Sequence, residues 1–147
     1  MKFIKTSIFL SLFALFANAQ TPFELSGVKS YYPVVELNSD RIDKKYKQIL
    51  LDMIVETSEE LEINTQNFST RSLAFLISYI GVGDTIALKI ELMLGENAKR
   101  LDTKDNIFVI SYMSSRILVV EDLEFDLLET AQELLYNFAQ QYKDDNL

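Results

Sequence analysis

An acidic run near the C-terminus has the spacing of a calcium-binding loop. Asp122, Glu124 and Asp126 are followed by Glu133, eleven residues after Asp122. These acids occupy the first, third, fifth and twelfth positions of such a loop, but its sixth position requires glycine for a sharp turn and Leu127 stands there. We interpret the acids as the start of a helix, whose dipole they complement. We therefore predict no metal ligands and no cofactor.

Two further motifs match catalytic or nucleotide-binding patterns only in part. Ser26 and Lys29 have the S-x-x-K spacing of penicillin-binding enzymes, but they lead into a predicted strand, and the accompanying S-D-N and K-T-G elements are absent. Gly81-Val82-Gly83 lacks the third glycine of a dinucleotide loop, so we interpret it as a turn. Neither motif is specific enough to assign a reaction.

The composition removes most other kinds of catalysis. The 147 residues include no Cys and no His, which excludes His-based triads, thiol nucleophiles, imidazole or thiolate metal sites and disulfides. The 22 acids are so numerous that some pair always lies close together, so an acid pair alone does not indicate a glycosidase. We predict no catalytic residues and a chain that is not an enzyme.

Charge and length limit the partners. The 14 Lys and Arg are outnumbered by 22 Asp and Glu, for a formal net charge of -8, and the hydrophobic content of 48% is typical of a single globular domain. An acidic surface repels nucleic acid and anionic membranes. We expect a neutral, basic or apolar partner and no nucleic acid.

The first 19 residues have the pattern of a secretory signal peptide. Lys2 and Lys5 precede an apolar stretch over residues 7–16, and Ala17-Asn18-Ala19 forms an A-x-A cleavage site. The apolar stretch is shorter than the ~20 residues that span a bilayer. We expect a secreted or periplasmic protein that begins at Gln20, with no membrane insertion after removal of the signal. Losing two lysines and no acid changes the formal charge from -8 to -10.

Hydrophobic periodicity predicts the elements of one domain. Alternating or continuous apolar runs predict strands, and apolar residues at three- and four-residue steps predict helices. The predicted strands cover residues 28–37, 72–80, 86–94, 107–113 and 116–121. A polar connection runs from Gly95 to Asn106, and Ser114-Ser115 forms a turn between the last two strands. The predicted helices run from Asp40 to Glu62 and from the capping residue Asp122 to Lys143. Residues 20–27 are then an N-terminal extension, 28–143 the domain, and 144–147 an acidic tail.

This order predicts an α+β fold. A strand-helix-strand crossover followed by antiparallel strands and a final helix, β-α-β-β-β(-β)-α, places two helices on one face of a mostly antiparallel sheet. Pro33 lacks an N–H and indicates an edge strand. Residues 72–80 are apolar on both sides, which is typical of a central strand.

The element order resembles small α+β modules of bacterial cell-envelope proteins, such as the N-terminal domain of TolB and the accessory factors of curli secretion. The resemblance covers most of the mature chain but includes no shared motif, so it carries no functional residue over to this sequence. It implies a small envelope or secreted protein and, as a likeness of fold alone, assigns no activity.

We expect the helix-free sheet face to be the functional surface. If the predicted registers hold, this face carries apolar side chains that water alone covers poorly. The leading hypothesis is a non-enzymatic module that binds a protein partner, or itself, through that face or an edge strand. The candidate surface residues are Tyr32, Leu76, Ile80 and Met93.

Three alternatives remain open. Tyr31, Tyr32, Tyr79 and Tyr112 are a candidate aromatic surface for a ligand or peptide, although we interpret them first as ordinary strand residues at the boundary of the core. The chain is alternatively a carrier of a small apolar or amphiphilic ligand between helices and sheet, for which Met53 and similar side chains are suited. A hydrolase based on carboxylates or Ser is the third alternative.

Overall fold

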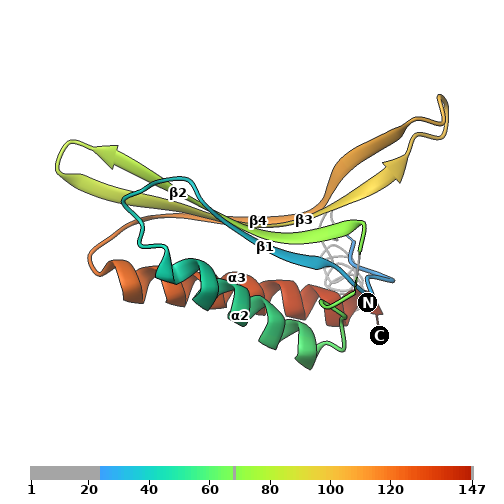
Figure 1. The fold of residues 1–147 in the computed structure, drawn as a ribbon, viewed down its shortest axis with the longest axis horizontal. Coiled ribbons are helices and arrows are strands. Elements are labelled where there is room, and N and C mark those ends of the chain that lie inside the picture. Colours follow the sequence, from blue (N-terminus) through green and yellow to red (C-terminus); the bar gives the residue numbers. More distant parts are fainter. Residues whose placement is uncertain (1–23, 68, 147) are drawn as a thin grey trace, which may run out of the picture.

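The protein is a two-layer α+β sandwich. The computed structural model describes residues 24–67 and 69–146. Its elements are β1 (Tyr32–Leu37), α2 (Lys45–Glu60), β2 (Arg71–Val82), β3 (Thr85–Lys99), β4 (Asn106–Val119) and α3 (Leu123–Asn146). The sheet order is β1-β2-β3-β4, with β1 parallel to β2 and the other pairs antiparallel. Both helices lie on the same side of the sheet (Figure 1), which confirms the predicted fold class.

The acids at the start of α3 cap the helix. Asp122 Oδ1 accepts a hydrogen bond from the Phe125 N–H (3.1 Å), and Asp126 Oδ2 accepts hydrogen bonds from the N–H groups of Glu121 and Asp122 (2.9 and 3.0 Å). Side chain and backbone thus satisfy one another across the first turn, as in a capping box. The helix-start interpretation of this acidic run is confirmed, with Glu124 and Asp126 in the first turn and Lys143 in the last.

Helix α2 begins later than predicted. The sequence predicts a start at Asp40, but the helix begins at Lys45, whose N–H donates to Asp43 Oδ1 (2.9 Å). Ile42 is buried, although it lies in the turn before the helix. An apolar residue that packs from a turn has the same spacing as one on the helix, so periodicity alone misplaced the boundary.

The second half of the sheet also differs from the prediction. We expected a polar connection after Leu94 and a turn at Ser114-Ser115, but β3 continues to Lys99 and β4 runs without interruption through both serines. Ser114 pairs with Leu92, and Ser115 with Glu91. Serine has only a weak preference for turns, and pairing along a neighbouring strand outweighs it.

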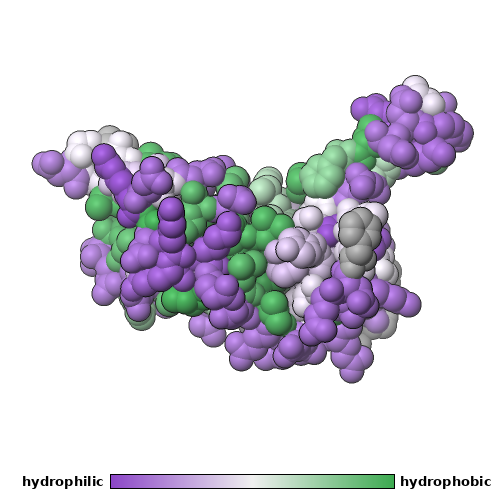
Figure 2. All heavy atoms as spheres, in the orientation of Figure 1, coloured by the Kyte–Doolittle hydropathy of each residue, from purple (hydrophilic) through white to green (hydrophobic). Residues whose placement is uncertain are grey.

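The paired strands bend sharply where their register shifts. A bulge falls between Leu94 and Gly95, and beyond it the β3–β4 arm (residues 95–110) rises away from the helices (Figure 1). The Phe108 ring fills the space beside Gly95, so a Cβ atom on residue 95 would lie only 2.2 Å from Phe108 Cζ. The base of the arm is apolar and its tip is hydrophilic (Figure 2).

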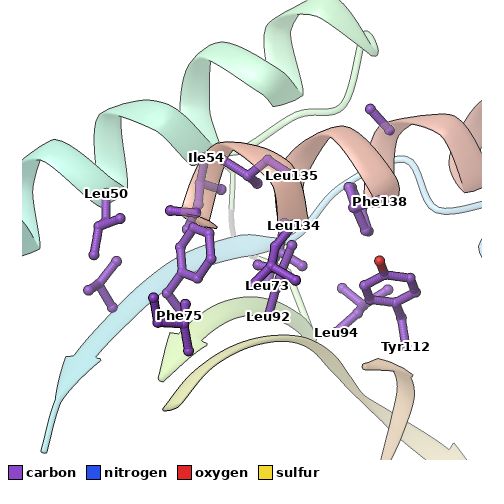
Figure 3. Close-up of a cluster of buried hydrophobic side chains, with 14 of the residues drawn as sticks. Leu50, Ile54, Leu73, Phe75, Leu92, Leu94, Tyr112, Leu134, Leu135 and Phe138 are labelled. Carbon is purple, nitrogen blue, oxygen red and sulfur yellow. The ribbon is translucent and has the colours of Figure 1, made fainter. Parts of the chain in front are cut away.

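The hydrophobic core lies between the sheet and the helices. Figure 3 shows side chains of both helices pointing towards those of β2, β3 and β4. Phe138 is in edge contact with Tyr31 and Tyr112, at ring-centroid distances of 6.1 and 5.2 Å. The fully buried residues include Leu50, Ile54, Leu73, Phe75, Ile77, Leu88, Ile90, Leu92, Leu94, Leu127, Ala131, Leu134 and Phe138.

One polar pair is buried in this core. The hydroxyl groups of Tyr31 and Ser58 are 2.6 Å apart, and Ser58 also donates to the Ile54 carbonyl (2.6 Å). Burial raises the pKa of Tyr31 to about 12, although the bond with Ser58 opposes that shift. The pair ties the segment before β1 to helix α2.

The two ends of the described chain pack against each other. Leu25 is fully buried, and its N–H donates to Asp145 (2.7 Å), while Asn146 donates to the Leu25 carbonyl (3.1 Å) and accepts from the Gly27 N–H (2.9 Å). The described parts of the predicted extension and acidic tail therefore belong to the packed domain, because α3 continues to Asn146. Residues 20–23 and the predicted signal, 1–19, lie outside the described residues.

Candidate functional site

The four predicted surface residues share the helix-free face of the sheet, which we call the open face. Leu76 and Met93 are half-buried near its middle, where Leu76 pairs with Glu91 and Met93 with Ala74. Tyr32 (59% exposed) lies at the start of β1 and Ile80 (37% exposed) near the end of β2. At about 3.3 Å per residue, these two lie roughly 25 Å apart along the strands. The four residues therefore do not form one cluster.

The largest exposed apolar side chains of the open face lie on β4, which the sequence did not single out. Met113, Ile117 and Val119 are 44%, 67% and 64% exposed. On the arm, the same strand adds the exposed side chains of Phe108 and Ile110. Because the sequence was divided into two strands at Ser114-Ser115, this stripe was missed. Its signal was present as alternating apolar residues on both sides of the serines.

The missing neighbouring strand explains the exposure of this stripe. Ile117 lies in one row of the sheet with Lys89 and Ser78, and these two are of intermediate burial whereas Ile117 is 67% exposed. Both have strands on two sides, whereas Ile117 has one only. A strand placed beside β4 would therefore cover more of Ile117 than it would of any inner residue.

The backbone of β4 presents unpaired groups at the same positions. The Val120 N–H donates to the Ile86 carbonyl (2.9 Å), and β4 is the last strand of the sheet. N–H and C=O directions alternate along a strand, so even-numbered residues face β3 and odd-numbered residues face outwards. We define the β4 edge as the outward-facing residues Met113, Ser115, Ile117 and Val119. Within residues 24–67 and 69–146, no strand pairs with it.

One side chain covers part of this edge. Arg116 Nη1 donates to the Ser115 carbonyl (3.2 Å), and Nη2 donates to Glu133 Oε1 of helix α3 (2.6 Å). Both charged side chains are about half exposed. An exposed pair of this kind is worth only about 0.2–1 kcal/mol, so an incoming strand can displace the guanidinium from the carbonyl at small cost.

The opposite edge of the sheet is obstructed near the start of β1. The Asn38 N–H donates to the Ile77 carbonyl (2.8 Å), so the even-numbered residues of β1 face β2 and the odd-numbered ones face outwards. Pro33, an outward position, has no N–H. Just before β1, the outward N–H of Tyr31 donates to the Asn64 carbonyl (3.2 Å). β1, which contains Pro33, is the first strand of the sheet, so the predicted place of Pro33 on an edge strand is confirmed.

The middle of the open face is polar as well as apolar. Lys89 Nζ and Glu91 Oε1 form an ion pair of 2.8 Å, and the Glu91 side chain is only 12% exposed. A layer stacked over the face would remove this pair from water, and the desolvation penalty of two charges often exceeds their attraction. The face therefore favours contact along its β4 border over contact across its centre.

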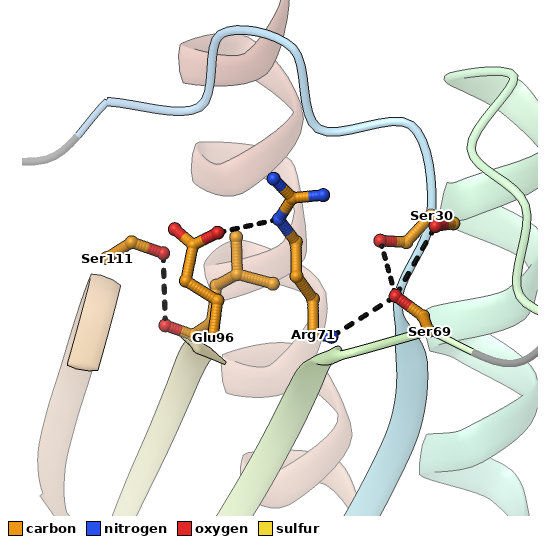
Figure 4. Close-up of polar contacts among 6 residues, drawn as sticks. Ser30, Ser69, Arg71, Glu96 and Ser111 are labelled. Carbon is orange, nitrogen blue, oxygen red and sulfur yellow. Dashed lines mark hydrogen bonds and ion pairs between the residues drawn. The ribbon is translucent and has the colours of Figure 1, made fainter. Parts of the chain in front are cut away.

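A second polar cluster holds the base of the arm (Figure 4). Arg71 Nε and Glu96 Oε2 are 2.7 Å apart across β2 and β3, and Ser69 bonds to the Ser30 carbonyl (3.1 Å) and accepts from the Arg71 N–H (3.2 Å). Burial acts to raise the pKa of Glu96, but hydrogen bonds from Arg71 and Ser111 outweigh it and lower that pKa. The cluster fixes strands to each other and leaves Arg71 engaged within the fold.

The four tyrosines do not form one aromatic surface, which agrees with their interpretation as strand residues at the core boundary. Tyr31 and Tyr112 are buried on the helix side, where both contact Phe138. The Arg41 guanidinium stacks on the Tyr79 ring, with its carbon 5.0 Å from the ring centroid, and Arg41 Nη1 donates a hydrogen bond to the Tyr79 hydroxyl (3.1 Å). Tyr32 is the one member of the four that is exposed on the open face. Strand periodicity separates these rings because neighbouring positions point to opposite faces.

The side chains that could have served catalysis or metal binding make structural contacts instead. Ser26 donates to the Glu24 carboxylate. Glu124 accepts from Lys45 Nζ (2.8 Å) and the Tyr46 hydroxyl (3.1 Å), and the bond from Lys45 lowers the pKa of this carboxyl. In the described residues, no three acids gather in a way that could hold a metal ion. These contacts join the starts of α2 and α3.

The alternative of a ligand carrier gains no support from the helix layer. A surface depression is lined by Met53, Phe125, Leu128 and the polar residues around them. It lies between the two helices at the start of α3 and opens to solvent, not between the helices and the sheet where a carried ligand was expected. The predicted carrier cavity is thus not the depression that Met53 lines.

Comparison with other proteins adds no assignment. No protein-family model matches the sequence, and no curated protein is significantly similar to it. Neither helix of the described chain combines the length and apolar character needed to cross a membrane. The β4 edge is therefore the candidate functional site.

Proposed function

We propose that this chain is a non-enzymatic protein-interaction module that adds an extended segment of a partner protein to its sheet along the β4 edge. One observation carries the proposal: the outward main-chain groups and the exposed apolar side chains of β4 belong to the same residues. In strand addition, main-chain hydrogen bonds supply affinity and alternate side chains supply specificity. Both parts of that recognition are present at this edge.

The partner segment should be extended, apolar at alternate positions and not acidic. Met93 pairs with Met113, so the predicted residue Met93 borders the proposed site, while Leu76 lies one strand further in. Ile80 and Tyr32 lie towards the ends of the open face and are peripheral to it. The described residues carry 12 Lys and Arg (14 less Lys2 and Lys5) against 22 acids, so an acidic segment is repelled.

We propose further that the chain is exported before it acts. The signal pattern of residues 1–19 supports this, and cleavage before Gln20 would retain every residue of the described fold. Intact mass spectrometry of protein from the cell envelope or medium is expected to show a chain that starts at Gln20. A full-length chain that retains Met1 in the cytoplasm would contradict export.

Site-specific photo-crosslinking in the producing cell tests the interaction. A photoreactive amino acid replaces Ile117 at the β4 edge, and a matched one replaces Tyr136, which is 62% exposed on helix α3. We expect discrete adducts from position 117 and none from position 136. Equal labelling at both positions, or none at position 117, would contradict a binding edge at β4.

A further inference from the structure

We infer that the strand bound at the β4 edge is β4 of a second copy of this chain, paired antiparallel with Ser115 opposite Ser115. This inference rests on the proposed function, since it uses the same edge. It adds the identity of the partner, the symmetry of the complex and the register of the two strands.

Symmetry favours a closed pair over an open chain of copies. Pairing β4 of one copy with β1 of the next would form an unlimited filament, but β1 lacks an N–H at Pro33 and is covered at Tyr31 by Asn64. Pairing β4 with β4 about a two-fold axis uses the open edge of both copies and leaves outside only the β1 edges, which are obstructed at Tyr31 and Pro33. The product is a continuous sheet with β1 at each end.

The pattern of β4 selects one register. With Ser115 at the two-fold axis, Met113 lies opposite Ile117 of the second copy, and the outward groups form about six backbone hydrogen bonds. A register shifted by two residues in one direction places Arg116 opposite Arg116, where the two side chains crowd each other and their ion pairs with Glu133, and it leaves Ile117 opposite Ser115. The shift in the other direction places Ile117 opposite Ser111, next to the bulge, and loses the apolar pairs.

The charges of the edge are compatible with self-pairing. Arg116 is the only charged residue of β4, and its partner Glu133 neutralises it. Lys89 and Glu91, the nearest charges on the open face, also form a neutral pair. Repulsion between copies then comes from the acids elsewhere in the chain, so raising the salt concentration should strengthen the association by screening.

The contact area predicts a weak dimer. If large apolar side chains present about 150–200 Å² each, the three exposed apolar side chains of the β4 edge, Met113, Ile117 and Val119, offer on the order of 300 Å² per copy. A standard stable interface buries about 800 Å² per partner, and smaller ones form transient complexes. We therefore expect a dissociation constant on the order of 10–100 µM.

Sedimentation equilibrium of the purified chain tests the dimer and its location. We expect reversible dimers, a loss of affinity of at least about tenfold for Ile117→Lys, and wild-type affinity for Ile80→Lys, on the same face but two strands away. Circular dichroism melting confirms that each variant folds. A monomer at ten times the expected dissociation constant, or equal losses for both variants, would overturn β4 pairing.

Disulfide trapping tests the register, because the chain has no cysteine of its own. Directly opposed residues of paired strands have Cα atoms about 4.5–5.5 Å apart, within reach of a disulfide. Ser115→Cys is expected to form a covalent dimer on mild oxidation. Ser78→Cys, on the open face of β2, is expected to remain monomeric under the same conditions. The reverse result would show face-to-face stacking and overturn the inference.

Photo-crosslinking at position 117 separates this inference from the proposed function. Adducts of twice the mass of the chain support self-pairing. Adducts with a different protein, combined with a strict monomer in sedimentation, overturn self-pairing and leave the binding edge intact. A strict monomer without any adduct contradicts both.

Discussion

The two outer strands of the sheet expose very different edges. β1 has six residues, contains Pro33 at an outward position and is covered at its start by Asn64. β4 has fourteen residues, no proline and, among the described residues, only the Arg116 guanidinium over its outward groups. Natural sheets usually protect both edges against pairing. This asymmetry between the two edges is the reason we propose that β4 is used for pairing.

The difference also has a structural origin. The segment before β1 is anchored on the helix side through Tyr31 and Ser58, and residues after α2 return to pair with it. β4 follows a hairpin and leads directly into α3, so no later segment among the described residues returns beside it. The connection between elements therefore decides which edge is closed, and the apolar side chains decide which edge is attractive.

The largest expected effect on stability follows from removal of the Phe138 side chain, which packs beneath both outer strands. Phe138 contacts Tyr31 near β1 and Tyr112 in β4, so Phe138→Ala should lower the free energy of unfolding by about 3–5 kcal/mol. Urea denaturation measures the change. Phe108→Ala is the control, and because that ring is 63% exposed it should cost less than about 1 kcal/mol. Equal losses would contradict the assignment of Phe138 as the shared anchor.

Alkaline pH should destabilise the fold through the buried hydroxyl of Tyr31. The pKa of Tyr31 is about 12 in the fold against 10.0 for the free side chain, so the folded state holds this proton more tightly. The resulting stability is complete below pH 10 and is lost between about pH 10 and 12, by about 2–3 kcal/mol. The measurement is the free energy of unfolding against pH, with Tyr31→Phe as control. An equal loss in the control would contradict the role of Tyr31.

A smaller effect is expected at the bend of the arm beside β4. Gly95→Ala places a Cβ 2.2 Å from Phe108 Cζ, and the exposed ring must move away, at a cost of about 1 kcal/mol. Hydrogen exchange over residues 96–110 should become faster. The double variant with Phe108→Ala removes the clash and should show no further loss from Gly95→Ala. A cost that persists in the double variant would show that the backbone, not the ring, requires glycine.

The smallest effect on stability is expected from a substitution of Pro33, the residue of β1 that has no N–H. Pro33→Thr restores a donor at an outward position, and the free energy of unfolding should change by less than about 1 kcal/mol. Sedimentation velocity at high concentration should show some species larger than the dimer, since β1 then accepts a strand. The combined variant Pro33→Thr, Ile117→Lys is the control. An unchanged distribution for Pro33→Thr would show that Asn64 alone closes this edge.

Local patterns were sufficient where a residue acts within its own element. The capping acids of α3, the buried stripe from Leu127 to Phe138 and the alternation of β3 depend on neighbours a few residues away, so the sequence predicted them and the fold class. Periodicity failed where a distant partner decides the outcome. Ile42 packs from a turn, and Ser114 and Ser115 remain extended because β3 lies beside them.

The sequence by itself therefore determined an acidic, cysteine-free α+β domain with two amphipathic helices on one side of a sheet. Only the tertiary structure decided which strand lies at the open edge, which groups of its backbone face outwards and which apolar side chains remain in water. The physical reason is that exposure along a strand depends on whether another strand lies beside it. That neighbour comes from a distant part of the chain or, as we propose, from a second copy.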